Sequence, residues 1–141
     1  MAASEDSEPP GSGGGAPGPE RSPAPSRAPP ATLALRLEEV TGWVMARAAT
    51  MPQKHKFTVG DKLVETCLEV TCLLVEASYT RDKLALLARA SRGLTRARVL
   101  ARLATRARAL SPDQLAHFER ETVEVGRMLG GWTRSARRSR A

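Results

Sequence analysis

Residues 81–108 read RDKLALLARASRGLTRARVLARLATRAR, and the pattern within them indicates one helix of a bundle. The stretch holds nine basic residues against one acid, Asp82, and only Gly93 disfavours a helix. Because each helical residue turns about 100° from the last, six small or aliphatic side chains share one narrow face. They are Leu87, Ala90, Leu94, Ala97, Ala101 and Ala104. Five arginines spread over much of the opposite side, namely Arg92, Arg96, Arg98, Arg102 and Arg106. Such a helix can pack into a bundle through one edge and hold a polyanion along the other.

Two helices are expected before this stretch. The first begins near Thr32, which suits an N-cap, and ends before Met51-Pro52, because a residue that precedes proline is pushed out of the helical region. Its apolar stripe is Leu33, Leu37, Val40, Val44 and Ala48. Residues 52–57 are expected to form a basic polar connector. Thr58 is predicted to cap the second helix, which runs to about Ser78 with Asp61 near its positive end.

The helix over residues 58–78 is apolar on more than one face, whereas a helix of an isolated bundle needs one apolar stripe. The first stripe is Leu63, Cys67, Val70, Leu74 and Ala77. The second set is Val64, Leu68, Cys72 and Val75, with Leu73 beside them. We expect this second set to form an oligomer interface with another subunit. The alternative is that this helix is the most buried member of the bundle.

The arginine-bearing helix is expected over residues 82–109, and Ser111 then begins the last helix. Ser111 suits the N-cap, Pro112 the first helical position, and Gln114 the returning hydrogen bond of a capping box. The apolar stripe that follows has the three-and-four spacing of a bundle seam. Its members are Leu115, Phe118, Thr122, Val125, Leu129 and Trp132.

Gly130-Gly131 is expected to interrupt this last helix and to leave a frayed basic tail over residues 136–141. Short loops between long helices make neighbouring helices antiparallel. The sequence therefore predicts an all-α fold, an up-down antiparallel four-helix bundle over residues 32–135.

Residues 1–31 hold most of the ten prolines, together with Gly, Ser and Ala, and show no apolar periodicity. Such a composition predicts a disordered N-terminal tail. From residue 32 onward the net charge is +9, which favours anionic partners such as nucleic acid. A simpler account is that a compositional bias towards arginine leaves merely solvated side chains. With neither a signal peptide nor a membrane span expected, the predicted location is the cytoplasm, without membrane contact.

Catalysis is poorly supported by the sequence, and we expect a protein that is not an enzyme and needs no cofactor. His55 and His117 lie in no recognisable nucleophile motif. Cys67 and Cys72 are about 140° apart on one helix, so the two thiols cannot share a metal ion. No catalytic residue and no metal ligand is therefore assigned.

Nucleic-acid binding fits the sequence better. The five aromatic residues offer few platforms for stacked bases, so we expect contacts with phosphates and little sequence preference. The candidate residues are Arg89, Arg92, Arg96, Arg98, Arg102, Arg106, Lys54, Lys56, Arg127 and Arg134. In a rival interpretation the helix arginines pair with carboxylates of the second helix or with Glu119, Glu121 and Glu124. The excess of arginines over carboxylates favours an accessible basic surface.

Two segments, KHKFTVGD at residues 54–61 and EVGRMLGGW at residues 124–132, carry a more specific signal. Together they resemble signatures of the accessory variability determinant (Avd) family of diversity-generating retroelements, with the resemblance covering about residues 33–135. These are four-helix-bundle proteins, similar to proteins encoded in bacterial 23S rRNA intervening sequences.

The resemblance implies a barrel-like homopentamer that binds the element's reverse transcriptase and the RNA template or cDNA. It also implies an accessory role in mutagenic retrohoming, without an active site. Two alternatives stay open: an RNA-associated protein of the intervening-sequence type, and a protein–protein adaptor with a basic docking face.

The segment of residues 54–61 has two interpretations. Lys54, His55 and Lys56 precede the positive end of a helix and would attract a phosphate. Alternatively, Phe57 packs as a hydrophobic staple and its neighbours are only solvated.

Overall fold

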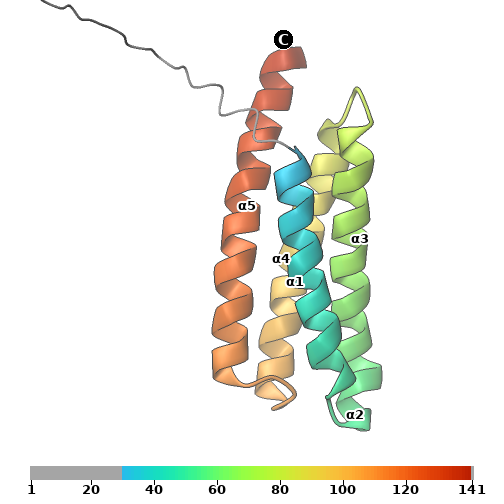
Figure 1. Ribbon diagram of the computed structural model, residues 1–141, viewed down its shortest axis with the longest axis vertical. Helices are drawn as coiled ribbons and strands as arrows, with labels where there is room; N and C mark the ends of the chain where they lie inside the picture. Colours follow the sequence, from blue (N-terminus) through green and yellow to red (C-terminus); the bar gives the residue numbers. More distant parts are fainter. Residues whose placement is uncertain (1–29, 141) are drawn as a thin grey trace, which may run out of the picture.

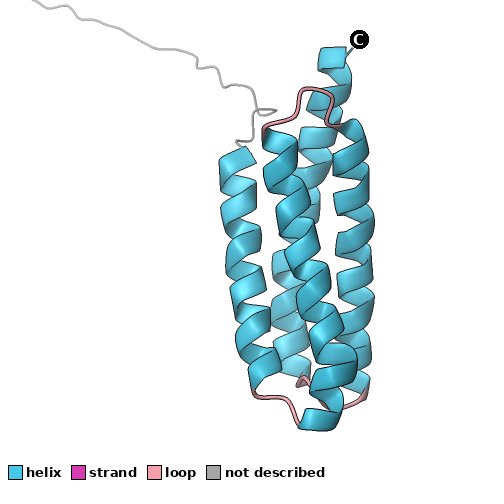
Figure 2. Cartoon of the chain, turned by 90° about the vertical axis from the view of Figure 1, so that its right-hand side faces the viewer, coloured by secondary structure: helices cyan, strands magenta, loops and turns pink. Residues whose placement is uncertain are grey.

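The computed structural model describes residues 30–140, which form four long helices packed as a bundle (Figure 1). The long helices are α1 (Pro30–Ala49), α3 (Asp61–Ser78), α4 (Leu84–Arg106) and α5 (Pro112–Arg140). A single turn, α2 (Gln53–His55), and a π-helix, η2 (Lys56–Gly60), lie directly before α3. Consecutive long helices run antiparallel, and α1 packs against both α3 and α5 (Figure 2). The predicted fold class is confirmed, while the predicted tail of residues 1–31 lies outside the described residues except for Pro30 and Ala31.

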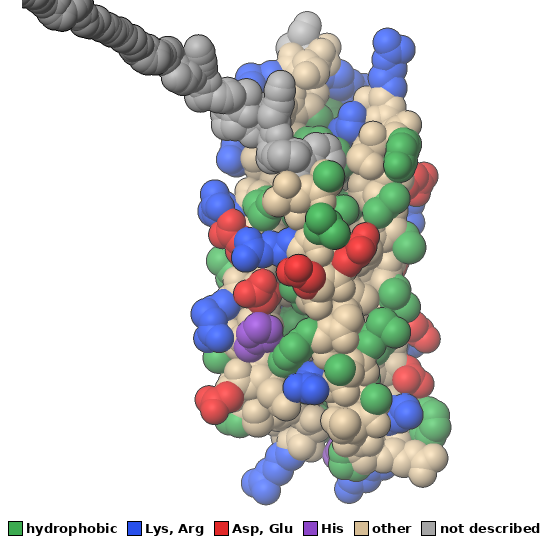
Figure 3. Space-filling view, in the orientation of Figure 1, with side chains coloured by type: hydrophobic (Ala, Val, Ile, Leu, Met, Phe, Trp, Pro, Cys, Tyr) green, Lys and Arg blue, Asp and Glu red, His purple; other side chains and the backbone are tan. Residues whose placement is uncertain are grey.

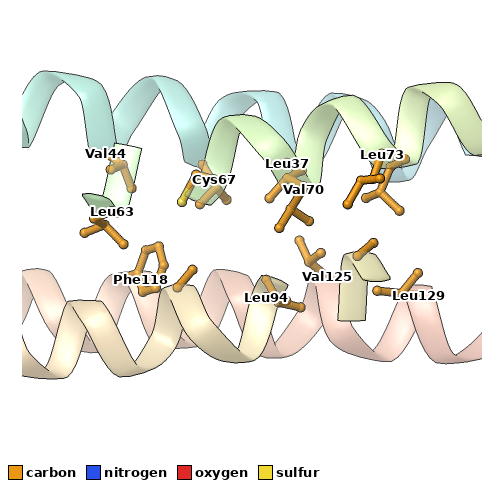
Figure 4. Packing of buried hydrophobic residues seen from close by; sticks show 14 of the residues in the cluster. Leu37, Val44, Leu63, Cys67, Val70, Leu73, Leu94, Phe118, Val125 and Leu129 are labelled. Carbon is orange, nitrogen blue, oxygen red and sulfur yellow. The ribbon is translucent and has the colours of Figure 1, made fainter. Parts of the chain in front are cut away.

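The core forms where the apolar stripes of the four long helices meet (Figure 4). Every residue predicted for the stripes of α1 and α4, and for the first stripe of α3, is buried. Phe118 and Val125 of α5 are fully buried, and Figure 4 shows them pointing towards the residues of α3. Full burial of such a side chain contributes about 1.5–3 kcal/mol relative to leaving it in water. The helical periodicity alone therefore predicted which face of each helix turns inward.

The α3–α4 contact is unusually close at Gly93. A Cβ atom placed on Gly93 would lie 2.6 Å from Val70 Cγ2, well inside the ordinary contact distance. The absence of a side chain at Gly93 thus lets Val70 pack directly on the backbone of α4. The one residue that disfavoured a helix in this stretch is the residue that sets the spacing of two helices.

The segment after α1 differs from the prediction. Residues 53–60 are helical and continue into α3, so the expected connector of residues 52–57 is largely the first part of a helix. Pro52 occupies the N-cap position, and its carbonyl accepts hydrogen bonds from the backbone N–H groups of His55 and Lys56, both at 2.9 Å. Thr58 does not cap a helix, because its hydroxyl donates to the Lys54 and His55 carbonyls. The N-cap is therefore Pro52 and not the predicted Thr58.

The π-turn of η2 brings Gly60 against the end of α1. Gly60 is buried, and a Cβ atom there would lie 2.9 Å from Sδ of Met51, which is itself buried. Isolated π-turns accommodate one extra residue within an otherwise α-helical segment. Here the extra residue places Gly60 against Met51, directly before α3 begins.

α4 ends three residues earlier than expected, at Arg106. Arg108 has a φ of 65°, in the left-handed region, and the Ala109 N–H donates to the Ala104 carbonyl at 2.8 Å. The Arg108 N–H donates to the Thr105 carbonyl at 3.0 Å, which completes a Schellman motif. A glycine normally marks this motif, so the sequence around residue 108 carried no stop signal.

The start of α5 follows the predicted capping box. The Gln114 N–H donates to the Ser111 hydroxyl at 3.1 Å, and the Ser111 N–H donates to the Gln114 side-chain carbonyl at 2.9 Å. The predicted interruption at Gly130-Gly131 is wrong, because α5 continues to Arg140. The flanking Leu129 and Trp132 are buried, and their packing outweighs the weak helix propensity of two glycines.

We predict that Gly93→Ala destabilises the protein by about 1 kcal/mol. Overpacking costs about 1–3 kcal/mol, and the better helix propensity of alanine returns only about 1 kcal/mol. Val70 cannot easily turn away, because its β-branched side chain has one preferred rotamer in a helix. Urea unfolding at a fixed protein concentration measures the difference.

Gly126→Ala is the matched control for this substitution. A Cβ atom there would lie 3.6 Å from Leu94 Cδ2, an ordinary contact, so we expect a gain of about 0.5–1 kcal/mol. Equal effects of the two substitutions would show that the α3–α4 spacing does not depend on Gly93.

Candidate nucleic-acid interface

The arginines of α4 line the side of the helix that faces away from the core. Arg89, Arg92, Arg96, Arg102 and Arg106 are exposed, and Arg98 is half-buried. The buried stripe of α4 faces the other way, so the core fixes the direction in which these guanidinium groups project. All six predicted contact residues of α4 therefore reach solvent from one helix.

Ion pairs occupy part of this surface. Arg89 Nη2 lies 3.8 Å from Glu69 Oε2, and Arg96 Nη2 lies 4.0 Å from Glu69 Oε1. Arg102 Nη1 donates to Glu119 Oε2 at 3.3 Å. The rival interpretation, in which the carboxylates of neighbouring helices pair with these arginines, thus holds for three of the six.

The other three arginines of α4 make no ion pair with any described residue. Arg92 and Arg106 are exposed, whereas the Nε atom of Arg98 is buried without a hydrogen-bond partner in the described part of the chain. Six arginines on α4 thus face two carboxylates, which leaves a surplus of about four positive charges. A surplus of this size requires counterions or an anionic ligand.

The sequence did not predict that apolar side chains would lie among these arginines. Val99 is 40% exposed and Leu103 is 49% exposed, and both project from the same outer side of α4. Their helical angle, about 120° and 160° from Leu87, could have identified them. The outer side of α4 is therefore a mixed surface of arginines and two aliphatic residues.

The remaining predicted contact residues lie elsewhere on the molecule. Arg127 is exposed on α5 and hydrogen-bonds to Glu124, which also pairs with Arg36 of α1. The hydrogen bond from Arg127 lowers the pKa of Glu124 below its usual value, although partial burial opposes the shift. Arg134 is exposed and lines a groove between α4 and α5. Neither residue belongs to the cluster on the outer side of α4.

Lys54 and Lys56 lie at the end of the bundle, within the first helical turns after Pro52. Lys54 is exposed and Lys56 is half-buried. Both lysines lie inside the helical segment that begins after Pro52, and not before it. Their positive charge therefore adds to that of the helix N-terminus only within the first turns. Phe57 is 63% exposed, which contradicts the alternative in which it packs as a hydrophobic staple.

The predicted oligomer interface is mostly accessible in the single chain. Leu68, Val75 and Cys72 are exposed, and Val64 is half-buried. Leu73 is only 5% exposed and belongs to the core of its own chain, so it cannot form part of an outer face. On the adjoining α1, Met45 is 49% exposed. Figure 3 shows hydrophobic side chains gathered along the α1 and α3 side of the molecule.

The register of α1 and α3 brings these apolar residues together. The hydroxyl groups of Thr41 and Thr71 lie 3.1 Å apart and mark one level across the two antiparallel helices. Met45 lies four residues further along α1, and Leu68 lies three residues back along α3, so the two side chains are within one residue of the same level. The two helices thus present a shared apolar face, which we call the α1–α3 face: Met45, Val64, Leu68, Cys72 and Val75.

The titratable residues that could support catalysis are dispersed. The His117 ring lies against Trp43, with ring centroids 4.8 Å apart, in the seam between α1 and α5. Burial raises the pKa of the Cys67 thiol to about 12, which keeps that thiol protonated and unreactive. Among residues 30–140, no group of three His, Cys, Asp or Glu residues is arranged to hold a metal ion.

The fold and this surface define a four-helix-bundle protein with a basic outer helix. A family model described as bAvd-like matches residues 32–136, and the chain therefore belongs to this family, the bacterial accessory variability determinants. No curated protein shows a significant match to the chain. Membership of the family implies an accessory protein of a diversity-generating retroelement, and proteins of this kind are generally not catalytic. No helix in the described part of the chain is both long and apolar enough to cross a membrane.

We predict that Phe57→Ala changes the free energy of unfolding by less than about 0.5 kcal/mol, because an exposed side chain buries little area. Phe118→Ala is the contrasting variant, and its cost is expected to be about 3–5 kcal/mol, because Phe118 is fully buried. Denaturant unfolding curves give both values. A large loss of unfolding free energy in Phe57→Ala would show that Phe57 does pack as a hydrophobic staple.

Proposed function

We propose that this protein is a non-catalytic accessory subunit that binds the reverse transcriptase of its retroelement together with the template RNA or cDNA. The observation that carries this proposal is the surplus of positive charge on α4, where six arginines face two carboxylates. Nucleic acid is the anionic partner that a retroelement supplies. Binding through this surface would hold the template close to the enzyme during mutagenic retrohoming.

The composition of the surface favours contacts with the phosphate backbone. α4 carries no aromatic side chain, and the two most exposed aromatic residues, Phe57 and Tyr79, lie near opposite ends of α3. Without an aromatic platform beside the arginines, splayed bases have little to stack on. The protein should therefore bind different sequences with similar affinity and lose affinity as salt is added.

We also propose that the α1–α3 face is the contact between subunits of a homopentamer. Its apolar residues are accessible in the single chain, and accessible apolar surface shared by two helices is typical of an interface. The outer side of α4 is distinct from this face. A closed ring pairs this face with a different surface of the neighbouring subunit, and assembly would bring several arginine-bearing helices into one particle.

A basic docking face for a protein is the second candidate function. Val99 and Leu103 favour it, because accessible aliphatic residues among arginines suit an acidic protein surface. A gel-shift assay with generic RNA at low salt separates the two functions. A pure protein adaptor would not shift the RNA.

We predict that the double variant Arg92→Ala/Arg106→Ala binds single-stranded RNA about tenfold more weakly than the wild-type protein. Both arginines lack an ion-pair partner among the described residues, so each loss removes a charge that nucleic acid can neutralise. The slope of log K against log salt should fall in magnitude by about 1.4. Filter binding at several salt concentrations measures both quantities.

The control for this experiment is Arg36→Ala/Arg140→Ala, which removes the same total charge. Arg36 pairs with Glu121 and Glu124, and Arg140 pairs with Asp82. We expect a much smaller loss of affinity from this pair. Equal losses would show that binding follows net charge and that α4 has no special role.

We predict that Leu68→Lys dissociates the oligomer without loss of helicity. Lysine at the centre of the α1–α3 face would place a charge in an apolar contact, where its desolvation is costly. Light scattering reports the mass of the particle, and circular dichroism reports the helix content. Val123→Lys on α5, where the native residue is 53% exposed, is the matched control and should leave the mass unchanged.

A further inference from the structure

Glu69 lies between two arginines of α4 without a full hydrogen bond to either. Its two carboxylate oxygens are 3.8 Å and 4.0 Å from the nearest nitrogens of Arg89 and Arg96. A charge-assisted hydrogen bond between these groups would be about 2.7–2.9 Å long. The guanidinium groups are thus attracted to Glu69, but their N–H groups do not form close hydrogen bonds with it and can donate to another anion.

Arg92 completes a small hollow at this point. The hollow has a volume of about 160 Å³ and is lined by Glu69, Arg89, Arg92 and Arg96. Arg92 makes no ion pair with any described residue, so three positive charges surround one negative charge. The side chains of Glu69, Arg89 and Arg96 are each about half exposed, so an anion can enter from solvent.

The hollow lies beside a close contact between α3 and α4. Val70 follows Glu69 in α3 and packs on Gly93, which follows Arg92 in α4. Both contact residues are buried. The backbone positions of Glu69 and Arg92 are therefore set by the core, although their side chains remain adjustable.

We propose that this hollow is a discrete site for one backbone phosphate of a nucleic acid, and that Glu69 is an internal competitor of that phosphate. The inference rests on the proposed binding of nucleic acid to α4. A phosphodiester and a carboxylate both carry one negative charge and present two oxygens to an arginine fork. Three arginines can accept a second anion, and Glu69 repels that anion from inside the site.

Glu69 has a second effect in the unliganded protein. Arg89, Arg92 and Arg96 repel one another along α4, and the Glu69 carboxylate of α3 offsets part of that repulsion. A phosphate that entered the site would provide the same compensation. The carboxylate thus keeps the free protein packed at the expense of affinity for the nucleic acid.

The test compares Glu69→Gln with Glu76→Gln. Glu76 is exposed on α3, makes no ion pair with any described residue, and lies two helical turns, about 10 Å, from Glu69. At an effective separation of about 5 Å in water, removal of the Glu69 charge should tighten binding of single-stranded RNA about fourfold. Glu76→Gln should tighten it less than about twofold, because salt screens charges beyond about 10 Å.

Thermal unfolding supplies a second measurement that does not depend on RNA. Each variant is heated in sodium phosphate and in sodium chloride at equal ionic strength. In chloride, Glu69→Gln should have a lower Tm than Glu76→Gln. Phosphate should raise the Tm of Glu69→Gln more than it raises the Tm of Glu76→Gln. A role of Glu69 that is merely structural would lower the Tm without this specific response to phosphate.

The outcomes separate the inference from the proposed function. If the wild-type protein binds RNA but the two variants match in affinity and in their response to phosphate, the phosphate site is wrong and the proposed function stands. If neither the wild-type protein nor Glu69→Gln retains RNA, the proposed function fails and the inference fails with it. Tighter RNA binding by Glu69→Gln alone, with its Tm restored by phosphate, supports both.

Discussion

The direct packing of Val70 on the backbone of α4 at Gly93 is the contact on which the rest of the arrangement depends. It holds α3 and α4 closer than two helices with side chains at both positions could lie. The residues next to this contact, Glu69 and Arg92, are consequently placed at the same level on the surface. The buried contact of Val70 with Gly93 thereby determines that the charges of Glu69 and Arg92 lie close together at the surface.

The molecule separates its surfaces by helix. α1 and α3 share an apolar face around Met45 and Leu68, whereas the outer side of α4 carries cations in excess over the carboxylates that reach them. The two surfaces do not compete, because the core stripe of each helix fixes which side faces outward. One small bundle therefore carries an apolar surface and a basic surface on different helices.

The sequence predicted the features that depend on local periodicity and local hydrogen bonds. The buried stripes and the capping box at Ser111 followed from spacing and from residue chemistry alone. Features that depend on neighbouring helices were missed or wrong. Tertiary packing of Leu129 and Trp132 carried α5 through two glycines, and Leu73 entered the core although it was expected at the edge of an outer face.

The position of Glu69 was missed for a related reason, although a signal existed. Residues equally far from the middle of the short α3–α4 connection must lie opposite each other in an antiparallel pair. Counting from Arg81 pairs Glu69 with Gly93, which places the carboxylate between the arginines at 89 and 96. The exact rotation of each helix still required the three-dimensional packing.

The length of α5 has a consequence for local order. Beyond Ala136, which packs against the core, the last four residues of the helix are all exposed, and the Arg140–Asp82 pair at 3.6 Å links them to the bundle. This final turn follows its own helix–coil equilibrium, decoupled from global unfolding. Its amide protons should therefore exchange with solvent long before those of the interior, and its conformation should respond to ionic strength while the bundle stays intact.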